Sequence, residues 1–424
     1  MAVKVHVPIE LLAHIVTYLG GDNATLRNLC LSSRALHAVS FPLLFSARDF
    51  RALGCDYLAP FLPYVHELRV SWKPDMHRNG DAEVLAKSLG PHLSPEATPR
   101  LQKLVIRGIS ADGMAYLNTL GDAFKGFSSL TALHLNETGH RNMRDVQVLI
   151  SALPRLEHLF LNALTWISPE YNECPDGESA FLERPALKSL RVSPVYPSCM
   201  IPLLVWLGRT PSARTLQTLE VPSSARIGPD AVPHFGPSVH HLCTPIRGLR
   251  PTSLDKYTCL ESLELHVGID DFMMRQYARL PDILVALPNP AALRALTLYV
   301  PFEAVFSFPG ALDVFARVDD ILSSHRVQLD GSSAVPTSGQ PSIGTPGQVG
   351  ESKGGFDALD EVNIVLQHTR ALEERDRAEA DWCQRLNMPK TGELRKMSVR
   401  FEWDTSMMHS FVRGPGGFGK GMCL

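Results

Sequence analysis

Apolar residues recur along this chain in one short pattern, in which two apolar residues three positions apart are followed by a third two positions later. A clear copy is Leu130-Thr-Ala-Leu133-His-Leu135. With weaker copies at Leu68 and Leu242, there are eleven, and their middle apolar residues fall at positions 68, 104, 133, 159, 190, 219, 242, 263, 296, 362 and 397. A self-similar period of this size indicates a solenoid, in which each unit is one supersecondary element.

The end of each copy alternates apolar and polar residues, which predicts a short strand with one buried face. In one copy, Leu104 and Ile106 point to one side while Val105 points to the other. A single unit cannot bury its leucines, so stacked units must bury them together, with their strands forming a parallel ladder. The spacing of 66 between positions 296 and 362 divides into 31 and 35 if a degenerate unit lies at Val327-Gln-Leu329, which makes twelve expected strands.

Helix-length segments with apolar residues at helical spacing lie between several of these strands. Strand and helix in alternation predict a curved α/β horseshoe with helices and loops on its convex side. Other connections are rich in proline, at 194, 197 and 202 and again at 229, 233 and 237, and we expect irregular loops there. The three helical stripes run from Met114 to Phe124, from Met143 to Leu153 and from Leu312 to Leu322.

These repeats resemble the leucine-rich-repeat family over about four-fifths of the chain, which implies an irregular solenoid over residues 60–410. The family's asparagine or cysteine, three residues after the last strand leucine, is mostly missing. Thr138 and Leu164 stand there instead. The backbone groups of these turns must therefore find other partners in each unit.

Residues 1–50 follow a different pattern, that of a small helical module. Val7-Pro8-Ile9-Glu10 opens a helix, since proline is favoured in a first turn and a carboxylate there interacts well with the helix dipole. Gly20-Gly21 ends it, and two further short helices follow. Three such helices form a core that is too small to be secure alone, so we expect them to pack against the solenoid, a partner, or both.

The same residues resemble the F-box, a motif that opens with Leu-Pro-x-Glu; here Val7-Pro8-Ile9-Glu10-Leu11-Leu12 corresponds to it. The chain departs from the family at Ala35-Leu36, where many members carry an aromatic residue. An alternative is that these helices only cap the solenoid. The resemblance implies binding to a Skp-type adaptor through Pro8, Ile9, Leu11, Leu12, Ile15, Leu26, Leu29 and Leu36.

Composition narrows the function classes. Lys and Arg total 41 against 44 Asp and Glu, and this formal charge of −3 gives no basic field for nucleic acid. The longest apolar run, residues 202–207, is far too short to span a bilayer. We expect no signal peptide, and the eight scattered cysteines then indicate reduced thiols in a cytoplasmic or nuclear protein.

No group of residues points to catalysis, a cofactor or a metal. Gly414-Pro-Gly-Gly-Phe-Gly-Lys-Gly421 imitates a phosphate-binding loop, but it lacks the Ser or Thr and the helix that should follow. The cysteines and histidines show no metal-ligand spacing along the chain. We therefore expect a non-enzyme with no cofactor and no metal.

Two further segments have a biased composition. Residues 331–355 hold seven Gly, five Ser and three Pro and no aromatic residue, which predicts a disordered insert. Residues 411–424 read as a flexible Gly-rich tail. Thr369 to Leu386 carries acid-before-base pairs four residues apart, which favour a solvated helix.

Together, these features predict a substrate-recognition subunit of an SCF-type cullin–RING ubiquitin ligase, as the two resemblances imply. The chain would bind the adaptor through residues 7–36 and a target protein, whose identity the sequence does not give, through the outward strand positions. The alternative is a leucine-rich-repeat scaffold with helical caps. The target-binding candidates are Arg107, His134, Phe160, Arg191, Glu220, Glu264, Thr297, Tyr299, Asn363 and Arg400.

Overall fold

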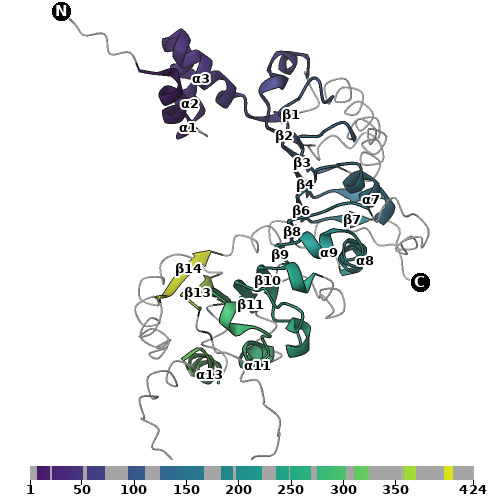
Figure 1. Cartoon of the computed structure of the whole chain (residues 1–424), viewed down its shortest axis with the longest axis vertical. Helices are drawn as coiled ribbons and strands as arrows, with labels where there is room; N and C mark the ends of the chain where they lie inside the picture. Colours follow the sequence, from purple (N-terminus) through teal and green to yellow (C-terminus); the bar gives the residue numbers. More distant parts are fainter. Residues whose placement is uncertain are drawn as a thin grey trace, which may run out of the picture. The chain divides into compact units, whose positions relative to one another are not determined.

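A computed structural model divides the chain into two compact units, residues 1–218 and 219–424 (Figure 1). Each contains helices and parallel strands, and the chain forms a mixed α/β fold with a large parallel sheet. Among the described residues, no helix is long and apolar enough to cross a membrane. The described residues are 7–19, 22–50, 55–71, 94–109, 125–166, 183–193, 197–221, 235–247, 249–268, 275–301, 310–323, 356, 358–368 and 396–403.

The first unit begins with three helices and continues with strands that pair in parallel in chain order (Figure 1). The helices are α1 (Ile9–Thr17), α2 (Asn23–Ser32) and α3 (Arg34–Leu44), followed by the 3-10 helix η1 (Cys55–Tyr64). The strands are β1 (Ala47–Phe50), β2 (Glu67–Ser71), β3 (Lys103–Arg107), β4 (Ala132–Asn136), β6 (His158–Asn162) and β8 (Ser189–Val192).

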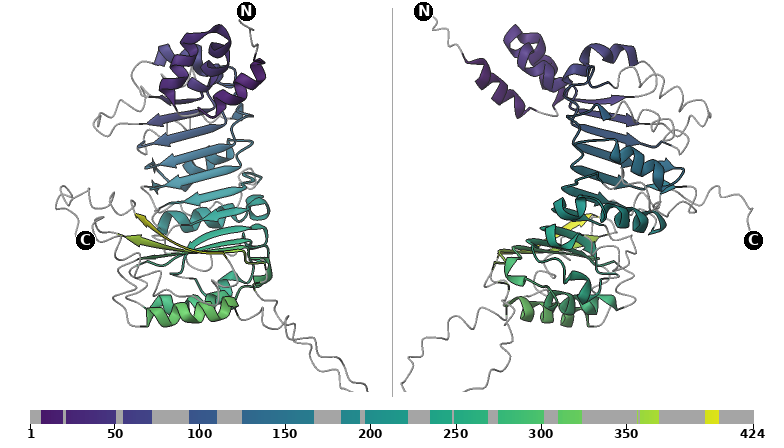
Figure 2. Two further views of the ribbon diagram at one scale, coloured as in Figure 1. Left: turned by 90° about the vertical axis from the view of Figure 1, so that its left-hand side faces the viewer. Right: turned by 45° about the vertical axis from the view of Figure 1, so that its right-hand side comes forward.

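The register of these strands aligns the middle apolar residue of each sequence pattern. Leu104 pairs with Leu68 on one side and with Leu133 on the other, and Leu159 and Leu190 continue the row. All five side chains are at most 1% exposed. Figure 2 shows the blue strands of this unit stacked as successive rungs. The alternation therefore predicted both the strand positions and their buried face.

A recurring backbone hydrogen-bond pattern marks where each strand begins. Two successive N–H groups donate to one carbonyl oxygen of the preceding strand segment, so the chain enters these strands at the same place relative to their neighbours. The pattern occurs in both units. Examples are Gln102 and Lys103 to His66, Thr131 and Ala132 to Gln102, Glu157 and His158 to Thr131, and Arg294 and Ala295 to Glu261, over 2.7–3.1 Å.

The turns after these strands use left-handed backbone in place of an asparagine ladder. Gly108, Glu137 and Ala163 each lie two residues beyond the last buried strand residue, and their φ angles are 70°, 52° and 51°. The N–H of Gly108 donates to Asn136 O, and that of Glu137 donates to Asn162 O. Backbone hydrogen bonds therefore link neighbouring turns at these positions.

Helices α7 (Met143–Ser151) and α8 (Pro197–Leu207) of the first unit lie on the same side of its strands (Figure 1). Helix α7 confirms the stripe from Met143, and the side chain of Asn142 accepts a hydrogen bond from the Asp145 N–H at 3.1 Å. The unit also contains the short strands β5 (Gly139–His140) and β7 (Thr165–Trp166) and the helix α9 (Ser212–Thr215). Strand β9 (Thr218–Glu220) begins at the last residue of this unit and continues into the second.

Helix α8 corrects the expectation of an irregular, proline-rich loop. Pro197 occupies the first turn, where its missing N–H costs nothing. Pro202 lies inside the helix and removes one hydrogen bond. Leu203, Leu204 and Trp206 are at most 1% exposed. Because burial of each such side chain contributes roughly 1.5–3 kcal/mol, packing outweighs the cost of the interior proline.

The second unit repeats the parallel arrangement. Leu242, Leu263, Leu296, Val362 and Met397 align in one row across its strands. The strands are β10 (His241–Pro245), β11 (Ser262–His266), β12 (Ala295–Pro301), β13 (Glu361–His368) and β14 (Lys396–Trp403). The helices are α11 (Leu280–Val285), α13 (Ala311–Ser323) and the 3-10 helices η4 (Gly236–Ser238), η5 (Pro251–Leu254), η6 (Gln276–Arg279) and η7 (Pro290–Ala292).

Direct pairing of β12 with β13 shows that the proposed degenerate strand at Val327-Gln-Leu329 was wrong as a rung of the ladder. Leu296 is the immediate partner of Val362, so no strand separates them. The long spacing of 66 is instead a connection that includes α13, which confirms the expected helix. Phe315, Val318 and Leu322 of its predicted stripe are buried, but Leu312 is 46% exposed. Chain spacing alone could not distinguish a degenerate rung from a long connection.

Several other predictions lie outside the described residues. They are the helical stripe from Met114 to Phe124, the insert at 331–355, the solvated helix at 369–386 and the tail at 411–424 with its glycine-rich motif. The loops expected around Pro229 and Pro233 also lie there.

Candidate protein-interaction surfaces

Helix α1 begins where the sequence predicts. The Pro8 carbonyl accepts hydrogen bonds from the N–H groups of Leu11 and Leu12, both at 3.1 Å, and Glu10 lies in the first turn. Pro8 itself has φ −56° and ψ 143°, an extended conformation that directs the chain into the helix. Proline and glutamate together therefore fix the start of α1.

The next two helices begin at side-chain caps. The Asp22 carboxylate accepts a hydrogen bond from the Thr25 N–H at 3.0 Å, and the Ser33 hydroxyl accepts one from the Leu36 N–H at 3.2 Å. The hydrogen bonds from Thr25 hold the pKa of Asp22 below its usual value. Side-chain caps of this kind stabilise the first turn of a helix, which matters in a module as small as this one.

One face of α1 is apolar and exposed to solvent. Leu11, Ile15 and Tyr18 follow one another at spacings of four and three residues, so they lie along a single helix face, and they are 49%, 51% and 76% exposed. Val16, on another face, is 2% exposed and packs inside the module. We call Leu11, Ile15 and Tyr18 the α1 apolar stripe.

The other adaptor-binding candidates have different environments. Pro8 and Ile9 are exposed beside the start of the stripe, while Leu12, Leu29 and Leu36 are half-buried. Leu26 is 1% exposed, so its side chain belongs to the core of the module. Sequence reasoning overlooked Leu31, which is 86% exposed on α2. In the sequence, Leu31 differs from Leu26 and Leu29 only in lying outside their helical spacing.

Aromatic side chains connect the helical module to the start of the strand ladder. Phe45, the residue that follows α3, stacks on Phe61 of η1 with their ring centres 4.1 Å apart and their planes at 4°. Phe41 meets Tyr64 edge to face at 5.5 Å. The module is therefore anchored through α3, and the α1 apolar stripe lies on a different helix.

The outward face of the first unit carries a second candidate surface. His134, Phe160 and Arg191 pair in register on β4, β6 and β8. The His134 and Phe160 rings lie 5.1 Å apart, and the Arg191 guanidinium lies 5.3 Å from the centre of the Phe160 ring. A cation over an aromatic face is a favourable contact. These three residues form a ladder of side chains across neighbouring strands.

Electrostatics keep His134 neutral in this ladder. Burial of its ring, together with the positive charge of Lys103, lowers the pKa of His134 to about 4. Arg107 lies one row further along the strands, with its guanidinium 3.6 Å from the Glu137 carboxylate. Both of those side chains are well exposed, so their ion pair contributes little to stability. The permanent charge of the ladder is therefore the guanidinium of Arg191.

The outward face of the second unit holds most of the remaining target-binding candidates. Glu264, Thr297 and Asn363 lie in one row, and Tyr299 and the backbone of Arg400 lie in the next. Glu264, Tyr299 and Asn363 are half-buried, while Thr297 is 7% exposed and offers little surface. Glu220, on β9, is half-buried as well.

Two residues of this face were missed from the sequence. Cys243 occupies the same row as Glu264, on the neighbouring strand, and His266 lies in the row of Tyr299. The His266 and Tyr299 rings stack with their centres 4.1 Å apart and their planes at 3°. Position within the repeat could have predicted that Cys243 lies on this face, because Cys243 follows Leu242 just as Glu264 follows Leu263.

Comparison with known proteins leaves the family of this chain open. No protein-family model matches it, and no curated protein matches its sequence. Among solved structures it is similar to one described as the crystal structure of the Rad7 and Elc1 complex in yeast, at 15% identity and a TM-score of 0.32. That match covers 87% of this chain and 91% of the other. A likeness at this level gives no information about what the chain binds.

Proposed function

We propose that this chain is a substrate-recognition subunit of an SCF-type cullin–RING ubiquitin ligase, with α1–α3 as the adaptor-binding module and the strand ladder as the target-binding part. The observation that carries the proposal is the α1 apolar stripe. It lies on the helix whose opening, Val7-Pro8-Ile9-Glu10, resembles the F-box. Exposed apolar side chains grouped on one helix face are typical of a protein contact surface.

On this proposal the chain contributes binding and orientation, and the other subunits of the ligase contribute the chemistry. The adaptor covers Leu11, Ile15 and their exposed neighbours Pro8 and Ile9. The outward strand residues hold the target, with Phe160 and Tyr299 as anchors, since aromatic side chains dominate the energetics of protein interfaces. The target itself is a protein of unknown identity.

The experiment is co-purification of the full chain with a Skp-type adaptor and its cullin. Leu11→Asp and Ile15→Asp each place a carboxylate in the proposed contact, where it would be desolvated without a partner. We expect each variant to lose at least about 2 kcal/mol of binding free energy, which weakens adaptor binding roughly thirtyfold. Thr17→Asp is the matched control, because it adds the same charge to an exposed position on another face of α1.

We expect the two stripe variants to lose the adaptor while Thr17→Asp retains it, with circular dichroism unchanged in all three. A wild-type chain that retains no adaptor would refute the proposal. The alternative of a leucine-rich-repeat scaffold with a helical cap would then stand. The stacking of Phe45 on Phe61 is the contact that such a cap would use.

A further inference from the structure

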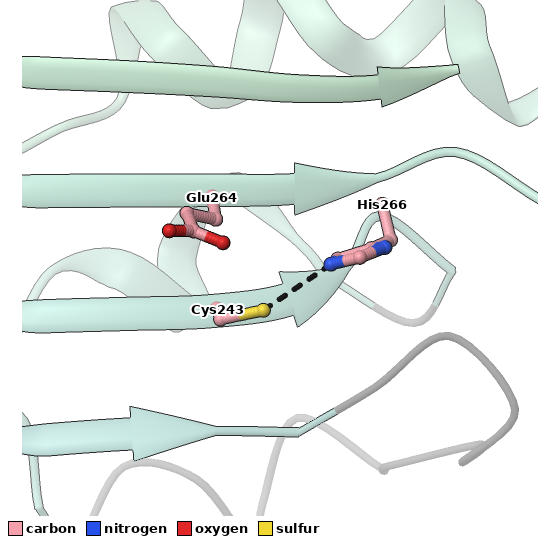
Figure 3. Close-up of side chains that lie close together, drawn as sticks. All are labelled: Cys243, Glu264 and His266. Atoms are coloured by element: carbon pink, nitrogen blue, oxygen red, sulfur yellow. Dashed lines mark hydrogen bonds between the residues drawn. The ribbon is translucent and has the colours of Figure 1, made fainter. Parts of the chain in front are cut away.

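Three side chains capable of binding a metal converge on the outward face of the second unit, on the neighbouring strands β10 and β11. Figure 3 shows Cys243 on β10 beside Glu264 and His266 on β11. The parallel register places Cys243 directly opposite Glu264. His266 lies two residues beyond Glu264 and therefore on the same face of the strand. The fold, and not proximity in the chain, brings the three together.

The separations between the ligand atoms are close to those of a metal site. The Sγ atom of Cys243 lies 3.2 Å from Nε2 of His266. Sγ, the imidazole nitrogen and a carboxylate oxygen of Glu264 all lie within 4.8 Å of one another. Tetrahedral zinc with ordinary bond lengths separates a sulfur from a nitrogen ligand by roughly 3.5 Å. The cysteine and histidine therefore need little movement, and the half-buried Glu264 side chain can turn towards them.

Neighbouring side chains restrict the ligand groups. The Tyr299 ring, stacked 4.1 Å from the His266 ring, limits the rotation of that imidazole. Nε2 of His241 lies 3.6 Å from a carboxylate oxygen of Glu264, within ion-pair distance but beyond a hydrogen bond. Partners of this kind, behind the residues that bind the ion, orient ligands and strengthen metal binding. Cys243 is 7% exposed, which shields its sulfur from solvent.

We propose that Cys243, Glu264 and His266 bind one zinc ion, with water in the fourth position. A thiolate, an imidazole and a carboxylate together are the ligand types that zinc prefers, whereas calcium and magnesium take oxygen ligands. Binding releases the thiol proton of Cys243 to solvent, since the thiolate is the ligand. The site does not depend on the proposed ligase function. It lies on the outward strand face, where a bound ion would add a positive charge.

The test uses the purified full chain under reducing conditions, with cobalt(II) as a spectroscopic probe and zinc measured by elemental analysis after dialysis. Cobalt bound by a thiolate gives an intense charge-transfer band in the near ultraviolet, and tetrahedral coordination gives visible bands. We expect one metal ion per chain and both sets of bands. Cys243→Ser should remove the charge-transfer band, and His266→Gln should lower metal affinity at least tenfold.

Matched controls separate this site from adventitious binding. Cys259→Ser removes an exposed free thiol, and His240→Gln removes an exposed imidazole, and both positions lie outside the cluster. These two variants should bind metal as the wild type does. Zinc should raise the melting temperature of the wild type and not that of Cys243→Ser.

Three results would overturn the proposal. One is a wild-type chain without the thiolate band, and another is metal binding that survives in Cys243→Ser. The third is equal loss of binding in the control variants. If a substitution at Cys243 or His266 changes the circular dichroism spectrum, Glu264→Gln provides the same test through a half-buried side chain. It should then weaken metal binding while the thiolate band remains at saturating cobalt.

Discussion

Replacement of Leu133 by alanine tests the central physical argument for the ladder. Leu133 is 0% exposed and lies between Leu104 and Leu159 in the same row. The substitution removes about three methyl or methylene groups, worth about 2.4 kcal/mol of transfer free energy. Backbone hydrogen bonds on both sides hold the neighbouring rungs in place, so the cavity cannot collapse and adds to the cost. We expect a total loss of about 4 kcal/mol, in the upper part of the range for such substitutions.

The assay is urea denaturation combined with hydrogen exchange read by mass spectrometry. Peptides that cover β3, β4 and β6 should exchange faster by about a thousandfold in Leu133→Ala, which corresponds to the expected loss. Leu31→Ala is the matched control, because Leu31 is 86% exposed, and its loss should stay within about 0.5 kcal/mol. If Leu133→Ala lowers the free energy of unfolding by less than about 1 kcal/mol, or if the control lowers it equally, the argument that this row of leucines is buried is refuted.

Two further predictions follow from the same unit. Ala163→Gly should raise the free energy of unfolding by about 1 kcal/mol, because Ala163 has a φ of 51° that glycine adopts without strain. Ala132→Gly, within β4, is the control and should lower the free energy of unfolding. His140 is fully buried, and burial lowers its pKa to about 3, so the unfolded chain binds a proton below pH 6.5 that the folded chain does not. The free energy of unfolding should therefore fall as the pH is lowered from 6.5 towards 3, and His140→Gln should remove about 2 kcal/mol of this loss at pH 5. The measurement is urea denaturation at each pH, with His158→Gln, at an exposed position, as the control. Equal acid sensitivity in both variants would contradict this cause.

The strand positions could be read from the sequence because their signal is local. The alternation around Leu104, Leu133 and Leu263 predicted which residues are buried, and the structure has each of them at most 1% exposed. The start of α1 at Pro8 and the stripe of α7 were equally local, since capping and helical periodicity depend on neighbouring residues.

The adaptor-binding candidates were only partly separable from the sequence. Ile15 and Leu26 both fit a helical apolar spacing, yet one is 51% and the other 1% exposed. Periodicity shows that an apolar face exists, but packing between helices decides which face is covered. Leu31 lies off that spacing and is the most exposed of these apolar side chains.

By itself, the sequence determined elements that depend on short-range chemistry: the strands of the eleven repeat copies, their buried face and the start of the first helix. Only the tertiary structure decided which elements become neighbours. It paired β12 directly with β13, and it stabilised α8 around Pro202 by burying the leucines that follow. It also brought Cys243 beside Glu264 and His266, more than twenty residues away along the chain. Such contacts depend on strand register, which is set by the packing of whole rungs against one another.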